Sequence, residues 1–232
     1  MRHAAPRSPA AGFTLVEVLV ALLVMSILAV MAWQGVDGMV RTRDISQRQL
    51  EQTLRLNTVL AQWEQDLASV QDTAVLPQAL MCDGAAVRMT RRAADGVQVV
   101  VWALRPDTAG TDTGVFNWLR WAGPVVATSA ALQESWLASL QLQGVEPGQL
   151  QALTGLAQWQ VYFFQGNQWA NCQSTGNVAE AAPPPEPPAS GASAPSAAAR
   201  REDLPSGVRI VLGFAPGSGL AGSLTRDTLL EP

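Results

Sequence analysis

Residues 13–33 read FTLVEVLVALLVMSILAVMAW, an apolar stretch interrupted only by Thr14, Glu17 and Ser26. As an α-helix it would rise about 1.5 Å per residue to a length of about 30 Å, which matches the hydrocarbon core of a bilayer. A helix of this length on a soluble domain normally has a polar face, and this stretch has none. The sequence therefore predicts a membrane-spanning helix.

Residues 1–12, MRHAAPRSPAAG, are polar and basic and contain no acidic residue. In a secretory signal, a shorter apolar stretch is followed by small residues at the cleavage site. Here the small residues Ala10, Ala11 and Gly12 come before the apolar stretch. Cleavage after Gly12 would remove a basic leader and leave the helix on the mature protein.

Glu17 places a carboxylate inside the apolar stretch, where it costs a few kcal/mol. One interpretation is an interfacial charge that reaches the lipid headgroups. The other starts from cleavage after Gly12, which would put a charged amine on Phe13, four residues away on the same helix face. The amine of a neighbouring subunit would then pair with Glu17, strongly so at low dielectric, and would fix the register of association.

The segment GFTLVE, residues 12–17, resembles the cleavage and methylation motif of type IV pilins and type II secretion pseudopilins. The resemblance implies that a prepilin peptidase cuts after Gly12 and methylates Phe13, and that Glu17 guides subunit addition. It also implies a single-pass protein of the bacterial inner membrane with its globular part in the periplasm.

Three further segments resemble the minor pseudopilin J family: AWQGVDGMVRTR at 32–43, LAQWEQDL at 60–67 and LPSGVRIVL at 204–212. This resemblance implies a subunit at the tip of a periplasmic pseudopilus that serves protein export. The implied partners are minor pseudopilins of the I and K types, the major pseudopilin and the prepilin peptidase. A minor pilin of a type IV pilus is the first alternative, and a membrane-anchored periplasmic hydrolase is the second.

Residues 34–72 contain no proline and continue the helix into the periplasm. Spacings of four and three residues predict one apolar face that packs onto a domain, formed by Leu56, Leu60, Trp63, Leu67 and Val70. Gly35 and Gly38 mark either a point where the helix bends or a place where neighbouring helices pack closely.

Residues 73–232 are predicted to form a globular head of mainly antiparallel strands, so the fold class is α+β and pilin-like. A hairpin is expected from Ala85–Thr90 and Val97–Leu104 with a loop over Arg91–Gly96. Further strands are expected at Val115–Ala122, Gln158–Phe164 and Val208–Phe214, with a short helix at 131–143. The Pro- and Ala-rich residues 179–203 are expected to form a disordered loop, or alternatively a proline-rich ligand.

Cys82 and Cys172 are the only cysteines. The oxidising periplasm favours a disulfide between them, and two buried thiols are the alternative. Closing a loop of this length would stabilise the fold by about 4 kcal/mol in the chain-entropy model.

The rest of the composition excludes much chemistry. The only histidine is His3 and there is no lysine, which excludes Ser-His-Asp catalysis, His-containing zinc sites in the head and a P-loop. We expect no catalytic residue, cofactor or metal. Asp107, Asp112 and nearby carbonyls offer oxygen ligands for calcium, but no loop spacing supports a calcium site.

Two clusters in the head have alternative interpretations. Four tryptophans could form an exposed surface for partners or pack in the core: Trp118, Trp121, Trp159 and Trp169. A locally basic region contains Arg88, Arg91, Arg92, Arg105 and Arg120. Because aspartates are interspersed and the net charge is −4, a mixed solvated surface is favoured and nucleic acid is not an expected partner.

Overall fold

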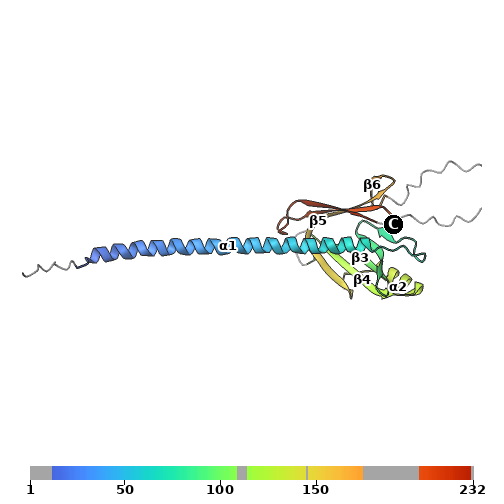
Figure 1. The fold of residues 1–232 in the computed structure, drawn as a ribbon, viewed down its shortest axis with the longest axis horizontal. Coiled ribbons are helices and arrows are strands. Elements are labelled where there is room, and N and C mark those ends of the chain that lie inside the picture. The colour runs from blue at the N-terminus through green and yellow to red at the C-terminus, as the bar shows by residue number, and fades with distance from the viewer. Residues whose placement is uncertain (1–11, 109–113, 145, 175–203, 231–232) are drawn as a thin grey trace, which may run out of the picture. The chain divides into compact units, whose positions relative to one another are not determined.

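The computed structural model describes residues 12–108, 114–144, 146–174 and 204–230, which form two helices and eight strands. The chain divides into two compact units, Met1–Leu50 and Glu51–Pro232. A long N-terminal helix is followed by an antiparallel sheet (Figure 1), so the predicted α+β, pilin-like fold is confirmed. The predicted loop at 179–203 lies outside the described residues.

Helix α1 spans Leu15–Ala68 and passes through Gly35 and Gly38 without a break. Among the described residues, it is the helix long and apolar enough to cross a membrane, with a mean hydropathy of 2.7 in its most apolar window. The helix ends at Ala68 rather than continuing to Val70. Val70 forms an isolated antiparallel bridge with Arg91, so its backbone pairs with the sheet.

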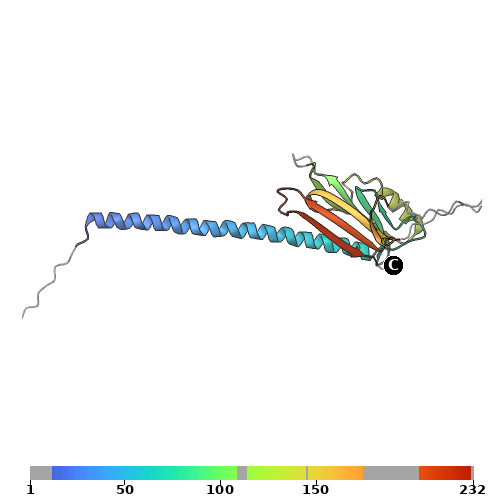
Figure 2. The same ribbon diagram turned by 90° about the horizontal axis from the view of Figure 1, so that it is seen from above.

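The eight strands of the described residues form one antiparallel sheet in the order β1-β2-β3-β4-β5-β7-β8, with β6 paired to β5. Figure 2 shows β5, β7 and β8 side by side. The strands are β1 Leu80–Cys82, β2 Ala86–Ala93, β3 Gly96–Pro106, β4 Phe116–Val126, β5 Gln149–Gln165, β6 Gln168–Asn171, β7 Gly207–Phe214 and β8 Ser223–Leu229.

Strand β5 is more than twice as long as predicted. Its first half pairs with β4 from Gln149 to Leu156, and its second half pairs with β7 as far as Phe164. The prediction missed residues 149–157 because glutamine, alanine and glycine there have weak strand propensity. Pairing with β4, which lies elsewhere in the sequence, makes this segment a strand.

The predicted hairpin exists, but its loop is shorter than Arg91–Gly96. Strand pairing continues to Ala93 opposite Gly96, so only two residues form the turn. Arg91 and Arg92 therefore belong to β2, and the Arg91 Nε donates to the Gln98 Oε1 across the strands at 3.1 Å.

Other boundaries also differ from the prediction. Strand β4 runs to Val126 instead of Ala122, and β1, β6 and β8 were not predicted. The predicted helix 131–143 is α2, Ser129–Ser139, which starts earlier because Thr128 caps it by accepting a hydrogen bond from the Ala131 N–H. β1 and β6 are only three and four residues long, too short to show a period-two pattern.

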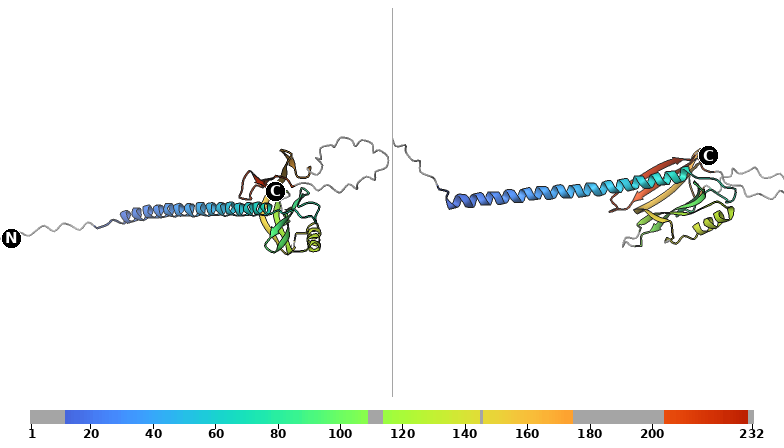
Figure 3. Two further views of the ribbon diagram at one scale, coloured as in Figure 1. Left: turned by 45° about the vertical axis from the view of Figure 1, so that its right-hand side comes forward. Right: turned by 60° about the horizontal axis from the view of Figure 1, so that its bottom comes forward.

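The two faces of the sheet carry two cores, and β3 contributes to both. Val100 and Trp102 pack with the apolar face of α1, whereas Val99 and Val101 pack with Leu132 and Trp136 of α2. Figure 3 shows α2 beside the strands of the green half of the sheet. The predicted helix face is confirmed at Leu56, Leu60, Trp63 and Leu67, all of which are buried.

Candidate functional site

The residues around the predicted cleavage site lie at the start of α1. Phe13 precedes the helix and is 82% exposed. The Glu17 N–H donates to the Thr14 Oγ1 at 3.3 Å, so Thr14 and Glu17 occupy the spacing of a capping box. A carboxylate in the first turn is also stabilised by the helix dipole. Glu17 thus has a local reason to sit here besides the predicted pairing with a neighbour.

The first part of α1 exposes an apolar surface that the described chain does not cover. The most apolar window of the helix has no buried residue, and Val16, Leu23 and Leu28 are each more than half exposed. Each such side chain gains roughly 1.5–3 kcal/mol when it is fully buried. This surface therefore requires lipid or neighbouring apolar helices.

A charge pattern follows the apolar stretch and was not predicted. Acidic residues at 37, 44 and 51 and arginines at 41, 48 and 55 each recur every seven residues, with every acid four residues before an arginine. The Asp37 Oδ2 pairs with the Arg41 Nη2 at 2.9 Å. Acid before base at this spacing is the favourable orientation on a helix. This seven-residue repeat can be found from the sequence alone.

The last arginine of this pattern contacts the sheet. The Arg55 Nε donates to the Ala152 carbonyl and its Nη2 to the Gln151 carbonyl, both at 3.0 Å. Both acceptors belong to the first half of β5, the part that the sequence did not predict as a strand. Arg55 therefore joins α1 to that half of the strand.

A buried carboxylate, Asp66, joins α1 to the sheet. Its side chain is fully buried and accepts from the Arg91 Nη1 at 2.6 Å, from the Trp102 Nε1 at 2.9 Å and from the Arg120 Nε at 2.7 Å and Nη2 at 2.9 Å. The Gln62 Nε2 also donates a hydrogen bond to the Asp66 Oδ1 at 3.1 Å. Asp66 thereby ties α1 to β2, β3 and β4.

Three of the five arginines in the predicted basic region form ion pairs, and Arg92 is exposed. Arg91 and Arg120 both form ion pairs with Asp66, and the Arg88 Nη1 lies 2.5 Å from the Asp83 Oδ2. Arg105 donates to the Leu142 carbonyl at 2.9 Å. The expectation of a mixed surface underestimated burial, because Arg88 is itself buried.

The environment of Asp83 favours its charged form. Burial alone would raise the pKa of this carboxyl, but hydrogen bonds from Arg88 and from the backbone of Ala86 and Ala85, with the nearby positive charge, outweigh it and hold the pKa below its usual value. At the sheet edge, the Arg209 hydrogen bonds likewise lower the pKa of Asp227.

Three of the four tryptophans considered for an exposed surface are buried. Trp118 and Trp159 pack in an aromatic cluster with Trp63 and Trp102, where neighbouring ring centroids lie 4.5–6.1 Å apart. Trp121 is buried against α2. The exposed-surface interpretation is therefore wrong for these three.

Trp169 remains half-buried, opposite Phe164 in the pairing of β6 with β5. It lies 5.1 Å from the ring of Phe164, centroid to centroid, and the Arg209 guanidinium carbon is 4.2 Å from its ring centroid.

Cys82 and Cys172 are joined in a disulfide with their Cα atoms 5.8 Å apart. The bridge connects the end of β1 with the turn that follows β6. The Gln173 Nε2 adds a hydrogen bond to the Asp83 carbonyl at 2.9 Å beside it. In the described part of the chain, no group of three or more His, Cys, Asp or Glu side chains could hold a metal ion.

Comparison with known families finds the prokaryotic N-terminal methylation motif at residues 7–33. This is the signal shared by type IV pilins and pseudopilins, and it covers the predicted cleavage site and the whole apolar stretch. No curated protein matches the chain. The chain therefore combines this motif with an apolar helix long enough to cross a membrane and with an α+β head of pilin-like fold.

Proposed function

We propose that this chain is a minor pseudopilin of the J type in a type II secretion system, and that it assembles through α1 into the tip of a periplasmic pseudopilus. The observation that carries the proposal is the methylation motif at the head of a helix whose apolar side chains have no partner in the described chain. A surface of this kind is suited to a membrane before assembly and to a bundle of similar helices afterwards.

The proposed maturation assigns a role to three residues. A prepilin peptidase cuts after Gly12 and methylates the new amine of Phe13. Glu17 then accepts the amine of a neighbouring subunit. Since charges attract strongly where water is excluded, this pair both drives association and fixes the stagger between subunits.

The proposed location is the bacterial inner membrane, with the head in the periplasm. The disulfide between Cys82 and Cys172 supports this orientation because such bonds persist in oxidising compartments. The proposed partners are the I- and K-type minor pseudopilins and the major pseudopilin. The proposed role is structural, with no catalytic residue.

Mass spectrometry of the membrane-extracted protein tests the maturation. Co-expression with a prepilin peptidase should remove residues 1–12 and add one methyl group to Phe13. Without the peptidase, the leader should remain. A chain that keeps Met1 in the presence of an active peptidase would refute the assignment of Gly12 and Phe13.

A second experiment tests Glu17. The variant Glu17→Ala should insert and fold normally but co-purify poorly with the partner pseudopilins. Ser26→Ala is the matched control, because its hydroxyl also lies in the apolar stretch but only bonds to the Leu23 carbonyl of the same helix. Normal recruitment of Glu17→Ala would contradict the proposed role.

A minor pilin of a type IV pilus shares every N-terminal feature described above. Deletion of the gene separates the two functions. Loss of enzyme secretion with intact twitching supports the pseudopilin, and loss of twitching with intact secretion supports the pilin.

A further inference from the structure

Beyond the apolar stretch, α1 carries a seam of exposed residues at alternating spacings of four and three. The seam consists of Val36, Val40, Arg43, Gln47, Leu50 and Leu54. Its four apolar side chains are each more than half exposed, so the described chain does not cover them. A seven-residue apolar repeat is the pattern by which two helices wind around each other in a left-handed coiled coil.

The same spacing runs through the preceding apolar stretch, where it passes through Leu22, Ser26, Ala29 and Trp33. Two helices that pair within the membrane can therefore stay paired along the seam without a change of register. Both would leave the membrane in the same direction, so they would be parallel. A helix of another membrane-anchored subunit has this geometry, and the proposed function requires such a partner.

The two flanks of the seam differ in charge. Three acids each follow directly after a seam residue: Asp37, Asp44 and Glu51. The residues directly before a seam residue on the other flank are uncharged: Met39, Ser46 and Thr53. In a coiled coil, side chains at these flanking positions form ion pairs between the helices and set the choice of partner. The ion pair of Asp37 with Arg41 in the same helix is exposed and contributes little, so it does not prevent such a contact.

Arg43 interrupts the apolar seam with a positive charge. It is exposed, and none of the ion pairs found in the described residues involves it. In a parallel pair of two copies in register, the two Arg43 side chains would face each other, and the acids would face the uncharged flank. Like charges placed in a seam reject one partner, and an opposite charge selects another. A second copy of this chain is therefore a poor occupant of the seam.

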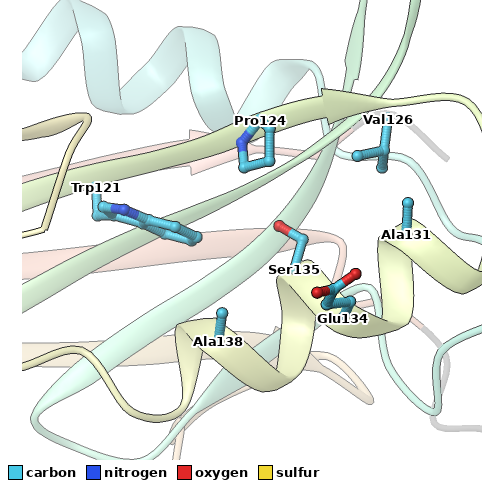
Figure 4. A pocket seen from close by; sticks show the side chains of 7 residues that line it. All are labelled: Trp121, Pro124, Val126, Ala131, Glu134, Ser135 and Ala138. Carbon is cyan, nitrogen blue, oxygen red and sulfur yellow. The ribbon is translucent and has the colours of Figure 1, made fainter.

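A groove in the head lacks such a pattern. It lies between α2 and the end of β4, and it is lined by apolar side chains, Ser135 and one charged residue, Glu134 (Figure 4). The Ser135 Oγ is buried against β4, where a Cβ on Gly123 would lie 2.8 Å from it. A single exposed charge sets neither the register nor the charge of an occupant, whereas the repeat on α1 sets both.

We propose that segment 36–54 of α1 pairs in parallel with a helix of a different membrane-anchored subunit. That helix has an apolar seam of the same spacing, arginine or lysine on the flank that meets Asp44 and Glu51, and an acid opposite Arg43. This inference rests on the proposed function and adds to it the charge of the partner helix. The ion pairs then select a different subunit over a second copy of this chain.

Altered copies of this chain can serve as the partner helix in a test. The full chain is co-expressed in equal amounts in two versions with different tags, and both versions carry Leu50→Cys in the seam. Because Cys82 and Cys172 are joined to each other, the new thiol is the free one in each chain. Oxidation in the membrane links two chains where their seams face each other, and the tags separate mixed pairs from like pairs.

Arg43→Glu in one of the two versions tests the charge within the seam. Random pairing would give as many mixed pairs as like pairs of both kinds together. With Arg43→Glu, mixed pairs should exceed like pairs about fivefold, because arginine then faces glutamate in the mixed pair alone. Arg48→Glu is the matched control, since it makes the same change outside the seam and should leave the random proportion.

The acidic flank is tested with a second set of versions. In a parallel pair, residues 39 and 46 of one helix lie opposite Asp44 and Glu51 of the other. A version with Met39→Arg and Ser46→Arg should cross-link to the parent about threefold more than the matched version with Met39→Glu and Ser46→Glu.

Several outcomes overturn the proposal. A random proportion of mixed pairs with Arg43→Glu refutes the role of Arg43, and equal cross-linking of the arginine and glutamate versions shows that the acids select no partner. Absence of any cross-link at residue 50 shows that this side of α1 does not pair. A preference for unaltered copies identifies a second copy as the occupant. Cleavage after Gly12 is measured in the same cells, so a failure of this proposal is distinguished from a failure of the proposed function.

Discussion

Asp66 is the side chain on which the attachment of α1 to the head converges. Its carboxylate is fully buried and satisfied by two arginines, an indole and an amide. A buried ion pair contributes little to stability by itself, because removing charges from water is costly. Removing one partner alone nevertheless lowers the free energy of unfolding strongly, because the opposite charges then stay buried without compensation.

Substitution of Asp66 tests how much this carboxylate contributes to the stability of the fold. Asp66→Ala should lower the free energy of unfolding by about 3 kcal/mol, because Arg91 and Arg120 lose their acceptor in a largely buried place. Chemical denaturation of the full chain in micelles measures the change. Asp95→Ala, at the exposed β2–β3 turn, is the control and should have a much smaller effect. A loss of less than about 1 kcal/mol for Asp66→Ala would show that water reaches the arginines.

The stability that Asp83 contributes to the fold should depend on pH. Because the folded head lowers the pKa of this carboxyl below its ordinary value of 3.8, the ion pair with Arg88 stabilises the fold above that value, and the contribution is lost as the pH falls through the folded pKa. Asp83→Asn should therefore be less stable than the parent at about pH 6 and nearly equal to it at about pH 2. Urea titrations across this range measure the difference. A constant gap at all pH values would contradict the assignment.

Among the elements, the exposed part of α1 between the apolar stretch and the head depends on local interactions. Its seven-residue repeat of acids and arginines places oppositely charged residues four apart, a spacing that contributes about 0.2–0.5 kcal/mol per pair to an isolated helix. The side chains of Asp37 and Arg41 are 47% and 77% exposed, so salt should weaken this contribution.

Reversal of one charge tests this pattern. Arg41→Glu would place three acids within two turns, and amide hydrogen exchange around residues 37–48 should become faster at low salt. Arg43→Glu makes the same chemical change off the pattern and should have a smaller effect. The difference between the two variants should shrink in about 1 M salt, where the screening length is about 3 Å. Equal exchange at low salt would refute a role for the pattern.

The strands show where sequence patterns stop being sufficient. The apolar face of α1 was predictable because it repeats within a few turns, and β7 was predictable because it contains the β-branched residues Val208, Ile210 and Val211. The first half of β5 was not, because its pairing with β4 depends on a distant partner. Asp66 and Arg120 are 54 positions apart in the sequence, and nothing local marks them as a pair.

For the whole molecule, the disulfide is the longest covalent constraint, since it joins residues 90 positions apart. Replacing both cysteines by serine should lower the free energy of unfolding by up to about 4 kcal/mol, because the unfolded chain gains freedom. Thermal unfolding with and without a reductant measures this effect. The reductant should destabilise the parent but leave the double variant unchanged, and a parent insensitive to complete reduction would contradict the prediction.

The convergence of hydrogen bonds on Asp66 also has a mechanical consequence. If the helix slid along the sheet by one turn, Gln62 would stand where Asp66 now lies, and its uncharged amide could not neutralise the two arginines. No intermediate position of the helix is favourable, so the contact between α1 and the sheet should resist gradual sliding. Under a pulling force, this contact should break in one abrupt step.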